Sequence, residues 1–339
     1  MASGKDELTR DDLVRELDRL DHELQNREKY LGIRRSCIDS LAGLTTDASL
    51  LPSPRAEAML NLGDALNSFD SEWALKVYHD GYRFARDNGL SDACKTFQLR
   101  IATFLPLSGY IEEAIARYCS IDTTGMSLER KVDYFDAGRQ MYSYIAAYHS
   151  QQTEESDRYM QLSRQAQKEL LPLLDPSTVK YKLNLGEYYF FEDKHIKAEA
   201  ILTDLINNLD ESDNIYARAC HILAYIAKPK GKILEHIYLL TRSAIADTKA
   251  ATREVASLQE LGSALFYYDD VERAHNYLST ALRNAVECKA SLRMIQSAQM
   301  IPIIEQAHQS QLTKSRYITY GVIVLLAIIL LLLIFTMWT

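Results

Sequence analysis

The chain has 339 residues, a net charge of −8 at neutral pH and five cysteines. The acidic balance and the lack of any Lys/Arg-rich block argue against nucleic-acid binding by this portion. The cysteines are odd in number and widely scattered, which argues against a zinc site or a disulfide framework, so we expect them to be small buried residues. Gly and Pro are scarce and apolar residues recur at i, i+3, i+4 and i+7, which predicts an all-α protein.

The first twenty residues are charged throughout and contain no apolar export signal. Apolar residues then recur at alternating spacings of four and three: Leu13, Leu17, Leu20, Leu24, Leu31, Ile38 and Leu41. The pattern predicts one amphipathic, heptad-like helix of about 30 residues within 1–44, followed by a linker at 45–55. We favour packing of this helix on the first repeat. Self-pairing into a homodimer is the alternative, and Arg27 and Arg34 in the seam disfavour it.

A recurring frame of small and large residues runs through the middle of the chain. A small residue is followed twelve positions later by alanine, and four positions after that by a large apolar residue. The members are Gly186–Ala198–Leu202, Gly262–Ala274–Leu278 and Ala102–Ala114–Tyr118, with looser matches at Ala224–His236–Leu240 and Gly63–Ala74–Tyr78. Small residues that face each other allow two antiparallel helices to approach closely, and the large residue fills the groove beside them.

This frame resembles the tetratricopeptide repeat (TPR). We assign about six degenerate units to residues 55–289, at 55–89, 91–122, 127–171, 176–210, 213–249 and 253–288. The predicted fold is therefore a TPR-like helical-hairpin solenoid, in which pairs stack into a superhelix. Residues 290–312 follow as a capping and juxtamembrane helix, in which we expect Pro302 to introduce a kink.

Tyrosine is unusually frequent, at 21 residues. Its side chain offers a large contact area at small entropic cost, and a hydroxyl for sugars or peptides. We expect a groove for a protein, peptide or small ligand, with Tyr142, Tyr148, Tyr189 and Tyr268 as candidate residues. Ordinary packing between helices is the alternative for most of the tyrosines, because this residue is intermediate in burial.

The last segment, 317–339, contains no charged side chain and is almost entirely aliphatic from Gly321 to Phe335. A helix of this length crosses a hydrocarbon core of about 30 Å. Flanking cations and aromatic rings are typical of membrane interfaces, and here they are Lys314, Arg316, Tyr317, Tyr320 and Trp338. The sequence therefore predicts a single-pass transmembrane helix.

No motif for catalysis or cofactor binding is present. GxxxxGK[ST], GxGxxG, HExxH, GxSxG and the EF-hand loop are all absent from the sequence. The histidines are dispersed, and the carboxylates fall on solvated helix faces. We therefore expect no enzymatic activity, no metal and no cofactor.

Two stretches resemble a known family: SAIADTKAATREVASLQELGSALFYYDDVERAHNYLSTALRNA, followed by MIPIIEQ, and LVRELDRLDHELQNREKYLGIRRSCIDSL near the N-terminus. They are similar to TPR-containing, single-pass membrane transcriptional regulators of Gram-negative bacteria. The resemblance implies a signal peptide, a periplasmic repeat domain and an inner-membrane helix, followed by a cytoplasmic coiled coil and a DNA-binding module. The chain lacks the signal peptide, the coiled coil and the DNA-binding module. We therefore expect it to contain the input half and its membrane anchor without the DNA-binding output.

Two functions follow from different topologies. Lys314 and Arg316 favour cytoplasmic repeats by the positive-inside rule, whereas the resemblance implies periplasmic repeats, which we favour. Periplasmic repeats would form the sensor of a transmembrane regulator. Cytoplasmic repeats would form a tail-anchored adaptor that holds a protein partner at the membrane.

Overall fold

The computed structural model describes residues 8–150, 152–253, 256–289 and 291–338, a range with α-helices and short 3-10 turns but no strand. The helices are α1 (Arg10–Gln25), α2 (Arg27–Thr46), α3 (Pro52–Leu66), α4 (Ser71–Asp87), α5 (Ser91–Phe104), α6 (Ile111–Cys119), α7 (Leu128–Tyr148), α8 (Thr153–Leu170), α9 (Val179–Phe191), α10 (His195–Asn207), α11 (Asn214–Ala227), α12 (Ile233–Lys249), α13 (Ala256–Tyr267), α14 (Val271–Cys288), α15 (Ser291–Ala298) and α16 (Ile301–Trp338). The 3-10 segments are η1 (Leu105–Ser108), η2 (Leu171–Leu173) and η3 (Lys228–Lys230).

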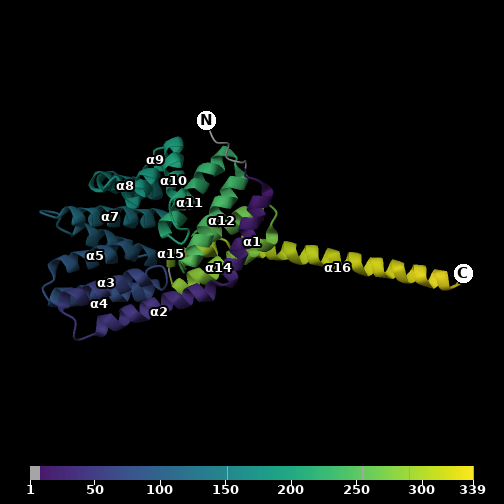
Figure 1. Cartoon of the computed structure of the whole chain (residues 1–339), viewed down its shortest axis with the longest axis horizontal. Coiled ribbons are helices and arrows are strands. Elements are labelled where there is room, and N and C mark those ends of the chain that lie inside the picture. Colours follow the sequence, from purple (N-terminus) through teal and green to yellow (C-terminus); the bar gives the residue numbers. More distant parts are fainter. Residues whose placement is uncertain (1–7, 151, 254–255, 290, 339) are drawn as a thin grey trace.

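Within the described residues, six consecutive antiparallel pairs, from α3–α4 to α13–α14, form the body of the molecule (Figure 1). Each helix packs on its partner within the pair, and neighbouring pairs pack on each other. Because no single pair can bury its apolar face alone, the stack shares continuous cores. The predicted TPR-like solenoid is confirmed.

The small residues of the repeat frame lie where paired helices cross. A Cβ added at Gly63 would come 2.3 Å from the Tyr78 ring, and one at Gly186 would come 2.6 Å from Leu202. Ala198 is fully buried at the same crossing as Gly186. These contacts are shorter than any side chain tolerates, so the close approach of the helices depends on glycine at these positions.

The fifth pair departs from this frame, because His236 of α12 stands where the second, fourth and sixth pairs carry Ala114, Ala198 and Ala274. Its Nδ1 lies 2.8 Å from the carbonyl oxygen of Ala224 on α11, and only 6% of the residue is exposed. Burial lowers the pKa of His236, which favours a neutral ring. With the ring neutral, Nδ1 donates to the carbonyl and Nε2 is an acceptor.

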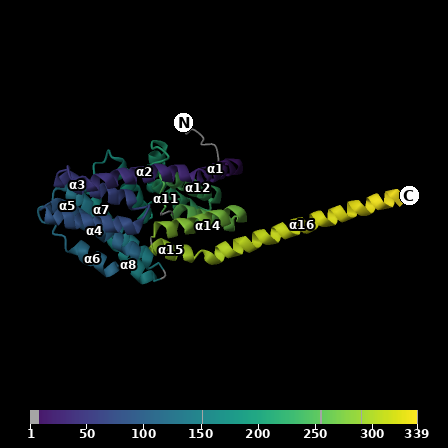
Figure 2. The ribbon, with the colours of Figure 1, turned by 90° about the horizontal axis from the view of Figure 1, so that it is seen from below.

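The stack of pairs closes on itself. The amide of Arg253 donates to the carbonyl of Ser68 at 2.8 Å, and its guanidinium lies 4.0 Å above the ring of Phe69. Ser71 Oγ and Cys288 Sγ are 3.4 Å apart. Lys289 Nζ lies 3.2 Å from an Asp70 carboxylate oxygen. We call these contacts the closing contact. Helix α15 packs on both α14 and η1, which follows α5. Figures 1 and 2 draw α15 next to α14.

The N-terminal segment is not the single helix that its apolar seam predicts. The chain breaks at Asn26, whose amide and side-chain amide both donate to the His22 carbonyl, so α1 and α2 are separate helices. Leu13, Leu17 and Leu20 of α1 join the core of the later pairs, and α1 packs on α12. The seam residues of α2 join the core of the earlier pairs instead, and α2 packs on α3.

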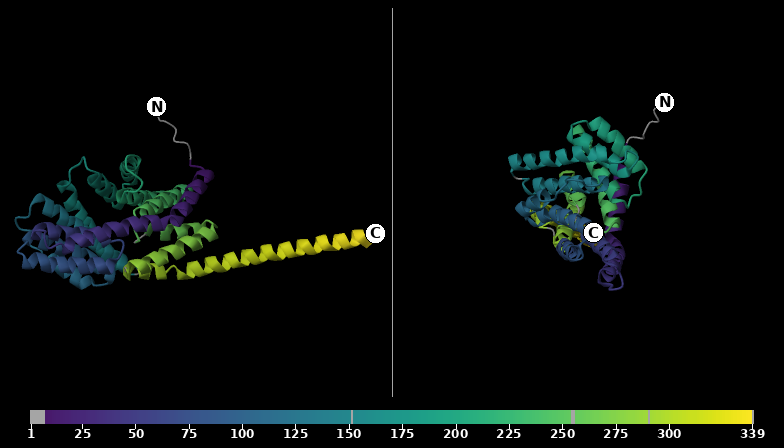
Figure 3. Two further views of the ribbon diagram at one scale, coloured as in Figure 1. Left: turned by 60° about the horizontal axis from the view of Figure 1, so that its bottom comes forward. Right: turned by 90° about the vertical axis from the view of Figure 1, so that its left-hand side faces the viewer.

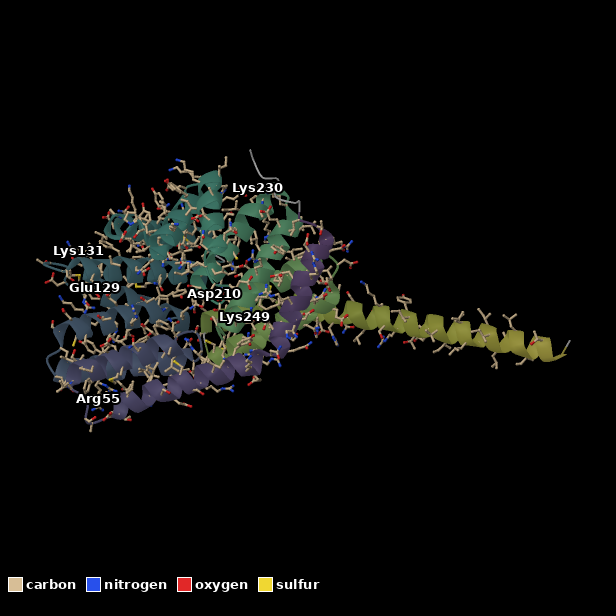
Figure 4. The ribbon with its side chains drawn as sticks, in the orientation of Figure 1. Arg55, Glu129, Lys131, Asp210, Lys230 and Lys249 are labelled. Atoms are coloured by element: carbon tan, nitrogen blue, oxygen red, sulfur yellow. The ribbon has the colours of Figure 1, made fainter. Side chains whose placement is uncertain are left out.

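Ion pairs fix α1 against the later pairs. Arg19 pairs with Glu211 in the loop after α10, and Arg273 Nε lies 2.9 Å from Asp21 Oδ2. Lys249, at the end of α12, lies 3.6 Å from Glu23 Oε1. Figure 4 shows Lys249 close to Asp210, beside α1. The seam arginines also serve contacts within the chain, because Arg34 donates to the Ala65 carbonyl and Arg27 to Glu287.

The C-terminal end differs from the predicted capping helix with a kink at Pro302. The helix instead ends at Ala298, and a new one starts at Ile301, so Pro302 occupies the first turn of α16, where its missing amide costs nothing. The first part of α16 packs on α14, and the rest projects from the body as a straight rod (Figure 3). Residues 301–312 of the predicted juxtamembrane helix thus lie with the apolar segment in one continuous helix of 38 residues.

No disulfide joins the five cysteines. Cys220 and Cys288 are buried, as expected for small apolar residues, and Cys94 is intermediate. The expectation is wrong for Cys37 and Cys119, which are exposed on α2 and at the end of α6.

Candidate functional site

A polar cavity lies on the inner face of the closed stack. It encloses about 470 Å³ between α2, α3, α7, α11, α12 and α13. An adjoining hollow of about 220 Å³ shares Asp64, Asn67 and Gln140 with it and extends to α5 and α9. We call the two together the central cavity. Early and late pairs both contribute walls, so the cavity exists only while the stack is closed.

Helix α7 supplies the densest row of polar side chains. Asp133, Asp136, Arg139, Gln140 and Tyr144 all border the central cavity. Their spacings of three and four residues place them along one side of a helix. This i, i+3, i+4 pattern of polar side chains is a sequence signal for the site, whereas the sequence-based prediction for this helix rests on its tyrosines.

A buried carboxylate, Glu187 of α9, organises one wall. Its Oε2 accepts from Gln167 at 3.0 Å and from Arg139 at 3.4 Å, and its Oε1 accepts from Arg218. Burial acts to raise the pKa of Glu187, but Arg218 and Arg139 outweigh it, so the pKa is lowered. The charged carboxylate therefore holds both guanidinium groups in the wall, where Arg218 borders the cavity.

Asp136 is the second centre of charge. Lys180 Nζ lies 2.8 Å from one of its oxygens and Arg139 lies 2.9 Å from the other. Burial opposes ionisation, yet Arg139 and Lys180 lower the pKa of Asp136 well below its usual range. Asp133, one turn earlier, is half-buried, and burial raises its pKa.

On the opposite wall, Asp64 links three helices. It accepts two hydrogen bonds from Arg100, at 2.9 and 3.2 Å, and one from the Tyr78 hydroxyl at 2.6 Å. Burial, followed by the nearby Asp64, raises the pKa of Tyr78, so the hydroxyl remains a donor. Cations and carboxylates are paired around the cavity, with hydroxyl and amide groups between them. The arrangement suits a small polar ligand rather than a strongly charged one.

The structure does not bring the four predicted tyrosines together. Tyr142 stacks on Tyr159 of α8 with ring centroids 6.4 Å apart, away from the cavity row of its own helix. Tyr148 lies at the end of α7 against Gly109. Tyr189 packs on the core of the later pairs, beneath the ammonium of Lys197 at 5.5 Å.

Tyr268 lies elsewhere, in the turn after α13. It borders a second, mainly apolar cavity, and the Arg10 guanidinium lies 5.9 Å from its ring centroid. Tyr144, which is not one of the four predicted tyrosines, borders the central cavity.

The family model of the SusR N-terminal TPR domain matches residues 24–299. The chain belongs to this family. The match spans the six helix pairs, the central cavity and every lining residue of the second cavity except Met300. No match was found among curated proteins.

Beyond this SusR-type TPR domain, α16 is long and apolar enough to cross a membrane, and it is the one such helix among the described residues. Tyr317 and Tyr320 are 73% and 62% exposed on it. Lys314 Nζ lies 3.5 Å from Asp269 in the α13–α14 turn, so the part of α16 just before its apolar run touches the last pair. Arg316 is also exposed, and the Trp338 side chain lies outside the described part of the structure.

Proposed function

We propose that the chain is the non-enzymatic, membrane-anchored input domain of a transmembrane transcriptional regulator, and that it binds a small polar ligand or a protein partner in the central cavity. The observation that carries the proposal is that both ends of the stack contribute polar walls to that cavity. Its walls come from α3 at one end of the stack and from α13 at the other, so an occupant would contact both ends at once.

Such a cavity can convert binding into movement. An occupant that contacts both ends binds the closed stack more tightly than an opened one, and this difference in affinity shifts the population between the two states. Cys288 and Lys289 of the closing contact directly precede α15 and α16. A change at the closing contact would therefore shift the helix that enters the bilayer.

Membrane topology tests the sensor role. Ser212 is exposed in the loop between α10 and α11 and is suitable for labelling. We would introduce Ser212→Cys in a variant without the native cysteines and treat intact cells with a membrane-impermeant maleimide. We expect labelling, which places the repeats outside the cytoplasm. Protection that disappears on lysis would contradict the sensor role.

One observation favours a second candidate, a tail-anchored adaptor with cytoplasmic repeats. Lys314 and Arg316 directly precede the apolar run, and cytoplasmic flanks are enriched in such cations. Protection from the maleimide would make this adaptor, which would hold a protein partner at the membrane, the leading proposal.

A further inference from the structure

A second cavity, of about 710 Å³, lies between the α11–α12 pair and α13. This volume is typical of sites for small molecules. Its walls are mainly apolar and are formed by Ile233, Ile237, Ala264, Tyr267, Tyr268 and Met300. Met300 directly precedes α16, and its sulfur accepts a hydrogen bond from Ser263 Oγ at 3.4 Å. The cavity thus adjoins both the last two pairs and the base of the membrane helix.

His236 gives this cavity its polar anchor. Alanine fills the equivalent position in the clearest pairs, at Ala198 and Ala274, where it is fully buried. The imidazole is buried too, but it borders the cavity, and its Nδ1 is committed to the Ala224 carbonyl. No described residue forms a hydrogen bond with its Nε2. A buried polar side chain at a position where the fold normally has a small apolar one is characteristic of functional positions.

The other polar groups leave the cavity with little net charge. Glu260 is already paired, because Tyr225 donates to its Oε1 at 2.7 Å and His221 Nε2 lies 3.3 Å from its Oε2. Lys228 is exposed at the rim. His221 borders the central cavity, whereas Glu260 and Tyr225 border this one, so this group separates the two cavities.

We propose that this second cavity binds a small, uncharged molecule that has an apolar ring or chain and one hydroxyl or N–H group that donates to Nε2 of His236. Apolar walls favour the body of such a molecule. The Nε2 acceptor of the imidazole in the cavity wall has no hydrogen-bond partner among the described residues, which favours a ligand that can donate over an ether that cannot. The bound molecule would contact Met300, and hence the segment that leads into α16. This proposal does not depend on whether the central cavity binds a ligand.

A thiol-protection experiment on the full-length protein in lipid nanodiscs tests the site. Ser263→Cys introduces a thiol into the cavity wall, while exposed Cys37 and Cys119 serve as internal references. Alkylation by iodoacetamide would be followed at each thiol by mass spectrometry. The probes are 2-naphthol, which carries the donor, and 2-methoxynaphthalene, which does not. We expect 2-naphthol to slow alkylation of the introduced thiol saturably, and the ether to act only at higher concentration.

Two variants identify the acceptor. His236→Ala introduces the alanine that Ala198 and Ala274 provide in two other pairs, so it should fold. It should weaken protection by 2-naphthol about three- to tenfold, the equivalent of one hydrogen bond. His79→Ala removes another partly buried imidazole, on α4, and should change nothing. Absence of protection, or equal slowing at Cys37 and Cys119, would overturn the site. Equal protection by both probes with no effect of His236→Ala would overturn the proposed class of ligand.

Discussion

Gly186 of α9 and Leu202 of α10 are packed so closely that a single added Cβ on the glycine would come 2.6 Å from a Leu202 methyl group. Gly186→Ala should therefore force Leu202 from its position and lower the free energy of unfolding by about 1–3 kcal/mol, partly offset by the better helix propensity of alanine. Thermal and urea unfolding followed by circular dichroism would measure the change.

Gly32→Ala is the matched control, because this glycine lies within α2 and has no atom within 4 Å of an added Cβ. There only helix propensity acts, so stability should rise by up to about 1 kcal/mol. Equal effects of the two substitutions would contradict the close crossing of α9 and α10.

Ala198→Phe tests the second small residue at the same crossing. Ala198 is fully buried, so a phenyl ring would separate α9 from α10 and lower the melting temperature, at a cost of about 1–3 kcal/mol or more. Ala200 lies two residues further along α10 and is exposed, so Ala200→Phe should leave the melting temperature nearly unchanged. An unchanged melting temperature for Ala198→Phe would contradict the repeat packing.

The sequence predicts the crossings well because they depend on local spacing within one hairpin. Gly186, Ala198 and Leu202 are close in the chain, and their packing is determined within one pair of helices. The break at Asn26 could not be foreseen in this way. Apolar residues continue through it with helical spacing, and the helix is divided because its two halves dock on different parts of the stack.

The central cavity was missed for a related reason. Glu187 contacts Arg139, which is 48 positions away in the sequence, and Arg218, which is 31 positions away. The network therefore exists only once three pairs have stacked. In the sequence these residues resemble the many charges of solvated helix faces. The tyrosines were more conspicuous, but Tyr142 and Tyr189 serve packing between helices.

Glu187→Gln tests the charge network of the cavity wall. The substitution leaves Arg139 and Arg218 without their shared carboxylate, and the loss of one partner from a buried ion pair costs about 3–5 kcal/mol. Because the pKa of Glu187 is lowered in the folded state, its stabilisation is present above the pKa of an ordinary glutamate and is lost as the pH falls below it. The acid limb of the stability–pH profile should therefore be shallower in Glu187→Gln.

Asp204→Asn provides the control for this variant. Asp204 pairs with Lys182 at 3.0 Å, but both side chains are exposed, so the loss should be at most about 1 kcal/mol. If Glu187→Gln is no more costly than Asp204→Asn in urea unfolding, the wall does not depend on the buried network.

Removal of Tyr317–Thr339 should release a soluble and mostly helical protein. Every residue of the deleted segment whose side chain the structure describes is exposed, whereas the first part of the helix packs on α14 and remains. Cell fractionation and circular dichroism would measure the outcome. Persistent association of the shortened chain with membranes would show that another surface also binds the bilayer.

The closing contact can be tested by a crosslink. Ser71 Oγ and Cys288 Sγ are 3.4 Å apart, so in Ser71→Cys the new thiol faces the native one, near the geometry that a disulfide needs. Mild oxidation should join residues 217 positions apart, which would change mobility on a non-reducing gel and raise stability by about 2–4 kcal/mol.

The control for the crosslink combines Ser71→Cys with Cys288→Ser and should give no fast-migrating species. If Ser71→Cys alone also fails to crosslink, although both thiols react with maleimide after denaturation, the two ends of the stack lie apart and the central cavity has lost its α13 wall. If the crosslink forms, the oxidised protein holds the closed state without any ligand. An occupant of the central cavity should then bind it more tightly than the reduced protein, because no binding energy is spent on closure.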